Sequence, residues 1–220
     1  MRLYRRYLLP RLINLVMQDK ATAAERTRYV PLAAGVVLEV GAGSALNLPF
    51  YGREVERLMA VDPSRELWEL GRRRLAAVRF PVDFVRCSAE SIPVPDGVFD
   101  AVVLTWTLCS IDDPAKALAE ISRVLKSTGR LIFVEHGRAP DHRVAAWQDR
   151  LNPWWRRVAG GCNMNRTIDT LIASSGFSIT QIETGYNPGP KPLTYLYKGV
   201  AVPASQRDCL TRLPSLVRIE

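Results

Sequence analysis

Two carboxylates and a pair of glycines carry the clearest chemical signal in the sequence. Glu39 lies near the end of an apolar run and is followed by Gly41 and Gly43, and Asp62 ends the next such run. Glycines let a backbone turn tightly and approach a ligand closely, and a carboxylate after the second strand can accept hydrogen bonds from both hydroxyls of a ribose. The pattern predicts a nucleoside-binding site, and the Glu39 carboxylate favours a cationic ligand.

A dinucleotide fits this loop poorly. The fingerprint G-x-G-x-x-G needs a third glycine at the position where this chain has Leu46. Asp62 also has a structural alternative, because it could cap the helix that is expected to begin near Ser64. The two roles of Asp62 are compatible, and both stay open at this point.

Alternating strand and helix patterns supply the framework for these residues. Short β-branched apolar runs alternate with helical patterns, which is typical of βαβ units around a parallel sheet. The predicted strands are 36–40, 58–61, 82–86, 101–105, 130–135, 178–184 and 194–202, and the predicted helices are 64–76, 113–126 and 167–175. We therefore expect a doubly wound, mostly parallel seven-stranded α/β sheet with its ligand at the carboxyl ends of the strands.

Length and charge favour one soluble domain that binds a small molecule. The chain has 220 residues and a net charge of +8, and its arginines are scattered without an interleaved aromatic stretch, so nucleic acid is not expected as a partner. No run of about 18 uncharged apolar residues is present, so a membrane-spanning helix is not expected. The sequence predicts a cytoplasmic protein, at most peripheral to a membrane, and leaves its oligomeric state open.

The four cysteines form no CxxC pair and show no disulfide-framework spacing. This distribution is typical of reduced thiols in the cytosol and gives little support to a zinc site or a redox motif. We therefore expect no metal.

The ends of the chain differ in character from its middle. Residues 1–30 are expected to form a basic amphipathic helical segment, 31–205 the ligand-binding domain and 206–220 a C-terminal tail. The first segment alternates basic and apolar residues, namely Arg2, Arg5, Arg6 and Arg11 with Leu3, Leu8, Leu12 and Leu15. Such a helix could cover the cleft as a lid, rest on a membrane surface, or pack on the domain with its arginines in solvent.

Several further segments resemble the class I methyltransferases that use S-adenosylmethionine (SAM). They are Cys87–Pro93, Pro95–Asp100 and Arg123–Gly129. The resemblance implies SAM as cofactor, with Glu39 and Gly41 at its methionine part, Asp62 at the ribose, and Ser88 with Ala89 at the adenine. The full set of expected cofactor-binding residues is Glu39, Gly41, Ala42, Gly43, Asn47, Asp62, Pro63, Ser88, Ala89, Glu90 and Thr105. Family members often have an acid in place of Ser88 and a glycine in place of Ala45.

A closer resemblance is to the methyltransferase-like thiol S-methyltransferases within the ubiquinone-methyltransferase-like group. It extends from about Val36 to Val200 and is most specific at Leu104–Ser110, Val134–His136, Trp147–Gln148, Leu151–Trp154 and Gly161–Asn163. It implies S-methylation of a small, fairly apolar thiol. The animal members have an apolar N-terminal membrane-associating segment, whereas residues 1–20 here are shorter and are broken by Pro10 and Arg11.

The expected acceptor side lies after the fourth and fifth strands. Because a thiol has an ordinary pKa of about 8.5, an imidazole could raise its thiolate fraction, and His136 is the candidate catalytic base; a hydrogen-bonded structural histidine is the alternative. Cys109 is expected near the donor methyl, most simply as a small buried side chain. The expected substrate-binding residues are Trp106, Cys109, His136, Trp147, Trp154, Trp155 and Asn163, with ordinary core packing as the alternative for the tryptophans.

These observations predict an enzyme that transfers a methyl group from SAM to a small apolar acceptor, most simply a thiol. The first alternative is C-, O- or N-methylation of a quinone-like molecule or a lipid. The second is a SAM-binding module without transferase activity, which the departures at Ala45 and Ser88 motivate. RNA methylation is a further alternative, and the scattered arginines argue against it.

Overall fold

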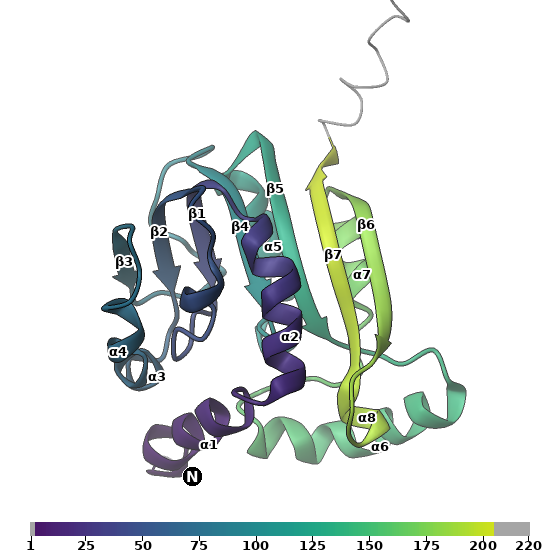
Figure 1. Ribbon diagram of the computed structural model, residues 1–220. Helices are drawn as coiled ribbons and strands as arrows, with labels where there is room; N and C mark the ends of the chain where they lie inside the picture. The colour runs from purple at the N-terminus through teal and green to yellow at the C-terminus, as the bar shows by residue number, and fades with distance from the viewer. Residues whose placement is uncertain (1–2, 205–220) are drawn as a thin grey trace, which may run out of the picture.

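A central sheet of seven strands organises the computed structural model, which describes residues 3–204 (Figure 1). The strands are β1 (Gly35–Val40), β2 (Val55–Val61), β3 (Val82–Val85), β4 (Phe99–Thr105), β5 (Leu125–His136), β6 (Phe177–Tyr186) and β7 (Tyr195–Pro203). Their order is β3-β2-β1-β4-β5-β7-β6, and β7 runs antiparallel to β5 and β6 while the other pairs are parallel. The predicted doubly wound, mostly parallel sheet is confirmed.

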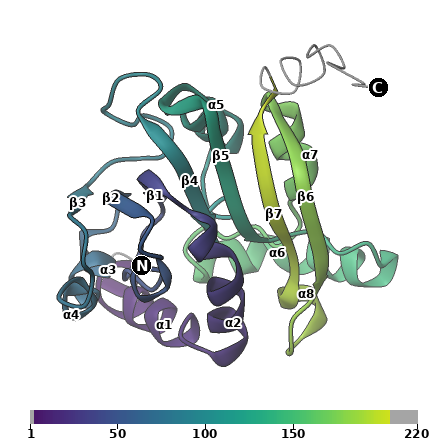
Figure 2. The ribbon, with the colours of Figure 1, turned by 45° about the horizontal axis from the view of Figure 1, so that its top comes forward.

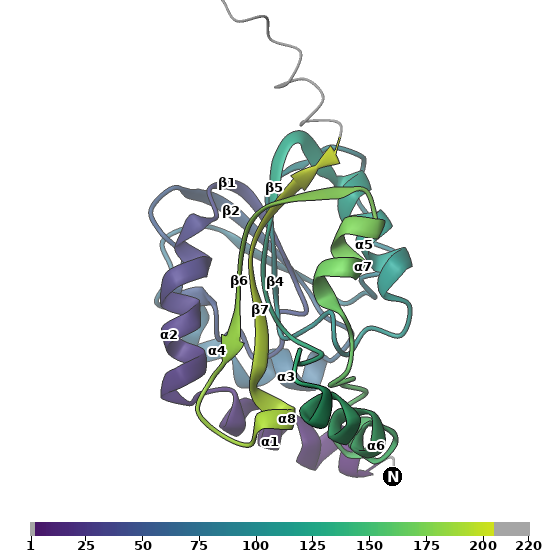
Figure 3. The ribbon, with the colours of Figure 1, turned by 90° about the vertical axis from the view of Figure 1, so that its right-hand side faces the viewer.

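Helices cover both faces of this sheet, so its central strands are buried on both sides. In β4, neighbouring residues Val102 and Val103 point to opposite faces, and both are fully buried in separate core clusters. Figure 3 shows α2 on one side of the sheet and α5 with α7 on the other, and Figure 2 shows the same arrangement from a tilted view. Burial on both faces explains why the strands read as continuous apolar runs in the sequence.

Helical elements connect the strands, and α1 and α6 lie beyond the carboxyl ends of the parallel strands (Figure 1). They are η1 (Tyr4–Leu8), α1 (Leu9–Val16), α2 (Lys20–Tyr29), η2 (Val30–Leu32), η3 (Leu48–Phe50), α3 (Arg65–Leu70), α4 (Arg72–Leu75), α5 (Pro114–Val124), α6 (His142–Val158), α7 (Ile168–Ser174) and α8 (Lys191–Thr194). Side-chain caps begin four of them, because Asp19, Ser64, Asp113 and Asp141 accept hydrogen bonds from backbone N–H groups of the first turn.

The largest differences from the predicted elements concern three helices. The helix expected over 64–76 is divided at Gly71, where a side chain would collide with the backbone of Ser44. The helix expected over 113–126 ends at Val124, and β5 begins at Leu125 instead of 130. Helix α6 was not predicted, since Pro153 lies inside it and its exposed face is rich in Trp and Arg.

A buried ion cluster fastens the N-terminal part of the chain to the sheet. Lys198 of β7 donates hydrogen bonds of 2.9 Å to Glu25 of α2 and to Glu183 of β6, and both Lys198 and Glu25 are buried. On the surface next to it, Arg28 pairs with the same Glu183 carboxylate. Helix α2 is therefore part of the folded domain and not a detached extension.

Within residues 3–204, none of the helices combines the length and the apolar character that crossing a bilayer requires. The expected tail, 206–220, lies outside the described residues.

Candidate active site

The carboxyl end of β1 presents a buried acid with neutral hydrogen-bond partners. Glu39 accepts hydrogen bonds from the Asn47 amide at 3.0 Å and from the Tyr51 hydroxyl at 2.9 Å. Burial raises the pKa of Glu39 to about 7, against the lowering effect of these two bonds and of Arg26. A cation placed beside this carboxyl group would favour its charged form, so the site suits a positively charged ligand.

The turn after β1 depends on backbone conformations that favour glycine. Gly41 and Gly43 have φ angles of +73° and +53°. A side chain on Gly41 would occupy the space of the Thr107 side chain, whereas a Cβ on Gly43 would meet no protein atom closer than the Gly41 carbonyl oxygen at 3.8 Å. The turn thus packs tightly toward β4 and leaves open space at Gly43.

Ala45, one of the departures noted above, has a φ of +58° and is buried. The conformation that favours glycine is therefore retained at this position although the residue has a side chain.

Asp62, at the end of β2, joins this turn to the start of α3. Its two carboxylate oxygens accept hydrogen bonds from the N–H groups of Gly43 at 2.8 Å and Ser64 at 2.7 Å. Ser64 itself caps α3 by accepting from the Leu67 N–H, so the helix-cap alternative for Asp62 is wrong. Each Asp62 oxygen keeps a second lone pair, which leaves the carboxylate able to accept from ligand hydroxyls.

Arg26 is a functional candidate that the sequence did not reveal. This residue of α2 is only 4% exposed, and its side chain donates to Asn47 Oδ1 at 3.0 Å and to the Met17 carbonyl at 2.8 Å. Its guanidinium carbon lies 4.8 Å from the centre of the Trp106 ring. Burial lowers the pKa of Arg26 to about 10, and Glu39 opposes this effect. The absence of apolar periodicity in α2 hid this inward-facing residue.

Asn47 and Thr105 connect the two strand ends. The Asn47 amide donates to Glu39 and also to the Thr105 hydroxyl at 2.9 Å. Ala42, which was expected in the same set, is buried in the turn. Glu39, Asn47 and Thr105 thus lie together at the carboxyl ends of β1 and β4, and their contact with a cofactor stays a prediction.

The predicted adenine-side residues form a separate loop after β3. Ser88 accepts the Glu90 backbone N–H at 3.2 Å, and Glu90 in turn accepts the Asp113 N–H at 2.8 Å, next to the start of α5. Ala89 between them is buried, and the Pro63 carbonyl accepts a bond from Arg86. The loop is thereby held between the ends of β2 and β4.

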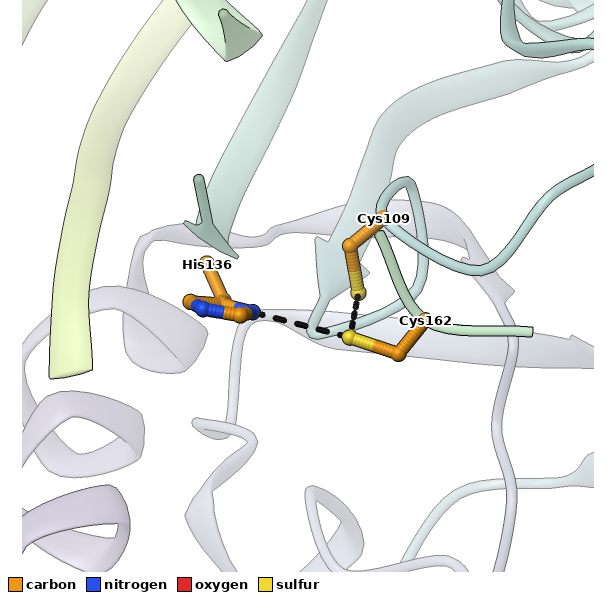
Figure 4. A group of neighbouring side chains, drawn as sticks. All are labelled: Cys109, His136 and Cys162. Carbon is orange, nitrogen blue, oxygen red and sulfur yellow. Dashed lines mark hydrogen bonds between the residues drawn. The ribbon is translucent and has the colours of Figure 1, made fainter. Parts of the chain in front are cut away.

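On the other side of the turn, two cysteines and a histidine meet (Figure 4). Cys109 follows β4, His136 ends β5 and Cys162 follows α6. Cys162 Sγ lies 3.5 Å from Cys109 Sγ and 3.6 Å from His136 Nδ1. The Asn163 backbone N–H and side-chain amide both donate to the Cys109 carbonyl, at 2.8 and 3.0 Å, which fixes the two loops together.

The ionisation of the two thiols differs. The hydrogen bond between the two thiols raises the pKa of Cys109 well above its ordinary value, and burial adds to this rise. The same hydrogen bond lowers the pKa of Cys162, against the opposing effect of burial. Cys162 is therefore the thiol that ionises more readily.

Glu135 supports this cluster from beneath and was missed by the sequence reasoning. It is fully buried, and it accepts hydrogen bonds from the backbone N–H groups of Thr107 at 2.9 Å and Cys109 at 3.4 Å. Burial raises the pKa of Glu135 to about 7. Its position in an apolar strand next to His136 was the available signal, because an acid in such a run needs buried partners.

The predicted tryptophans divide into two groups. Trp106 has a φ of +50°, an unusual conformation for a large residue, and its ring packs on Arg26. Trp155 lies near Cys162 and contributes to lowering the pKa of that thiol. Trp147 and Trp154 are 54% and 69% exposed on α6. The expectation that these last two wall the acceptor pocket is not met, because the helix turns them toward solvent.

The turn after β1, the acid after β2 and the position of β7 together define a Rossmann-like fold of the class I methyltransferase type. The family model described as "Methyltransferase domain" matches residues 38–133. A SAM-dependent methyltransferase from Thermotoga maritima has the same fold, with a TM-score of 0.60 at 19% identity over 92% of this chain and 98% of that one.

Two curated relatives, both methyltransferases, show the family to which the chain belongs. Phosphatidylethanolamine N-methyltransferase from Cereibacter sphaeroides is 31% identical over 73% of this chain and 78% of its own length. Thiol S-methyltransferase TMT1B from Rattus norvegicus is 33% identical over 70% of this chain, and the match spans 64% of that relative. The chain belongs to the SAM-dependent methyltransferase family.

Proposed function

We propose that the protein transfers a methyl group from SAM to the sulfur of a small, fairly apolar thiol. The observation that carries this proposal is the juxtaposition of two sites at adjacent strand ends. The turn at Gly41 packs against Thr107, and two residues further along the same loop Cys109 meets His136 and Cys162. The loop after β4 would thus contact both the SAM site, through Thr107, and a sulfur-rich site for the acceptor, through Cys109.

The residues of the β1 and β2 ends suit SAM by their chemistry. Glu39 is a buried acid, and Arg26 is the cation that acts on it. Asp62 has lone pairs for ribose hydroxyls, and Gly43 leaves room beside the turn. SAM supplies a methyl group activated by its sulfonium charge. Glu39 would orient the cationic part, and Asp62 would hold the sugar.

The acceptor side suits a thiol because methyl transfer requires little more than alignment and loss of the thiol proton. A nucleophile must lie in line with the methyl carbon at about 3–3.5 Å, and water must be kept away. His136 is buried at the end of β5, and its Nε2 has no hydrogen-bond partner within residues 3–204. This imidazole is our candidate to accept the thiol proton.

A second candidate function is methylation of a lipid amine or a quinone-like molecule at a membrane surface. Helices α1 and α6 both lie at the carboxyl end of the sheet (Figure 1). Together with the residues just before α1, these helices expose large apolar side chains, namely Leu3, Tyr7, Leu8, Leu12, Leu15, Val16, Trp147, Leu151, Trp154 and Val158. The relative from Cereibacter sphaeroides named above is a lipid N-methyltransferase, which is consistent with such a location.

In this proposal the protein is cytoplasmic and contacts a membrane peripherally, and the part of the N-terminal segment that precedes α2 acts as a lid. Contacts of the first helices support the lid: the Tyr4 hydroxyl donates to the Val158 carbonyl of α6, and Arg6 pairs with Glu66 of α3. The three described cysteines are free thiols, which suits a reducing compartment.

The deciding experiment measures methyl transfer from SAM to an alkyl thiol, the matching alcohol, a quinol, a phenol, a lipid amine and RNA, read by mass spectrometry. We expect a methyl thioether from the thiol alone, with or without lipid vesicles. Product from the lipid amine or quinol that requires vesicles would replace the thiol assignment. SAM binding without any product would indicate a binding module without transferase activity.

A further inference from the structure

We propose that Cys109, His136 and Cys162 bind a single zinc ion. No metal was expected from the sequence, because the cysteines lack a CxxC spacing. The fold supplies what the spacing lacks, since it brings the end of β5 and two separate loops to one point (Figure 4). The two Sγ atoms and the imidazole nitrogen all lie within 4.8 Å of one another.

The distances match the edges of a zinc tetrahedron. With Zn–S near 2.3 Å and Zn–N near 2.0–2.1 Å, ligand atoms in a tetrahedral site are roughly 3.5–3.8 Å apart. Two edges of the cluster, Cys109 to Cys162 at 3.5 Å and Cys162 to His136 at 3.6 Å, already have this length. The third edge, from Cys109 to His136, lies within the 4.8 Å that bounds the whole group.

The ligand loops are held in place before any ion binds. Asn163 donates twice to the Cys109 carbonyl, and Glu135 accepts the Cys109 N–H. The Asn152 side chain accepts the Met164 N–H at 3.0 Å, which ties the loop after Cys162 to α6. Prior ordering of this kind lowers the entropic cost of forming a metal site.

Two thiolates and one neutral imidazole balance the charge of Zn²⁺ and fill three of its four positions. Soft sulfur ligands with imidazole favour zinc over magnesium or calcium. A disulfide is the competing state of the same cysteines, but the sulfurs are 3.5 Å apart, well beyond the bond length of about 2.05 Å. The reduced, metal-binding state fits the observed geometry without a shift of the loops.

The open fourth position gives the ion a role that rests on the proposed function: it takes the sulfur of the acceptor thiol. In the zinc-bound state His136 is a ligand and not the base, so the thiol proton is released to solvent on coordination. The sulfur lone pair then forms the bond to the methyl carbon, the bond from that carbon to the sulfonium sulfur breaks, and its electron pair remains on the donor's sulfur. The thioether product is a weaker ligand than the thiolate and leaves the metal.

The test begins with metal content. Full-length protein is purified under reducing conditions, stripped with a chelator, equilibrated with zinc, desalted and analysed by plasma mass spectrometry. We expect about one zinc per chain, and loss of most of it in Cys109→Ser, Cys162→Ser and His136→Gln. The matched controls are Cys87→Ser, Cys209→Ser and the exposed His142→Gln, which should keep the zinc. Circular dichroism verifies that each variant is folded.

Replacement of zinc by Co²⁺ gives a readout that does not depend on methyl transfer. Thiolate-to-cobalt absorption should appear in the wild-type protein and shift when ethanethiol, but not ethanol, is added. No zinc in the reduced wild-type protein, or a disulfide between Cys109 and Cys162 that persists in reductant, would overturn the site. Zinc binding with no response to ethanethiol would overturn its role toward the acceptor. Thiol methylation at the full rate by a zinc-free protein would likewise overturn the role of the zinc toward the acceptor and leave the proposed function intact.

Discussion

The Arg26 side chain donates a 3.0 Å hydrogen bond to Asn47 Oδ1, so helix α2, which precedes the sheet, orients a residue of the proposed SAM site. Asn47 uses its amide group to reach Glu39 and Thr105 at the same time. The amide therefore has a fixed orientation, because its oxygen faces Arg26 and its nitrogen faces the acid. Four residues from separate elements form one connected polar network around the predicted methionine end of SAM.

Replacing Arg26 with Gln should weaken binding of SAM and of its demethylated product. The change leaves Asn47 Oδ1 without its charged donor and removes the cation nearest Glu39. We expect a tenfold to hundredfold rise in Kd, which corresponds to about 1.4–2.8 kcal/mol. Titration calorimetry measures this directly. Arg28→Gln, on the exposed side of the same helix, is the control and should bind normally.

Asp62→Ala should also weaken SAM binding, because it removes the predicted acceptor of the ribose hydroxyls and frees the Gly43 and Ser64 N–H groups. The expected loss is at least tenfold in affinity. Asp83→Ala, on neighbouring β3, removes an exposed carboxylate that pairs with Arg57 and should leave affinity unchanged. Equal affinity of the Asp62 variant and the wild type would remove Asp62 from the site.

The stability of the ligand-free protein should fall as the pH rises from about 4.5 to about 7. Burial raises the pKa of Glu39 and of Glu135 to about 7, so the folded state holds protons that the unfolded state has released in this window. Each group contributes a loss on the order of 2–3 kcal/mol. Urea unfolding at several pH values should show this slope, and Glu39→Gln should roughly halve it. Glu56→Gln, an exposed control on β2, should keep the full slope.

Ala45→Gly should stabilise the protein. Ala45 has a φ of +58°, in a region where an L side chain is strained and glycine is not. We expect a gain of about 0.5–1 kcal/mol in the free energy of unfolding. Ala42→Gly, in the same turn without a positive φ, should lower stability instead. A loss of stability in the Ala45 variant would mean that its methyl contacts outweigh the backbone strain.

The exposed face of α6 provides a test of membrane contact. Trp147 and Trp154 lie on this face, and Arg150 and Arg157 lie over their rings at 5.8 and 5.2 Å. A double change of both tryptophans to Ser should reduce binding to anionic vesicles several-fold in a sedimentation assay. Thiol methylation in the absence of vesicles should be unaffected. The same change at the buried Trp68 of α3, which stacks on Phe84, should instead lower stability.

The sequence was sufficient for the parts of the site that follow directly from a strand. Glu39, Gly41 and Asp62 are recognisable because an apolar run ends at each of them, and periodicity located the seven strands. Arg26 and Cys162 were not recognisable, since their roles depend on how distant segments pack. Cys162 meets Cys109 only because α6 returns the chain to the β4 edge, and Pro153 together with the exposed Trp and Arg side chains hid that helix.

The ion cluster around Lys198 limits which part of the chain can move when SAM enters and its demethylated product leaves. Glu25 is fixed by Lys198, and the next residue, Arg26, is fixed by Asn47, so two consecutive residues of α2 are fastened in opposite directions. Helix α2 is therefore held in place beside the SAM site and does not move aside to let a ligand in or out. We therefore propose that the segment before Asp19, and not α2, controls how the nucleoside enters and leaves the site. Substitutions there should alter how fast the product departs and leave its equilibrium affinity largely intact.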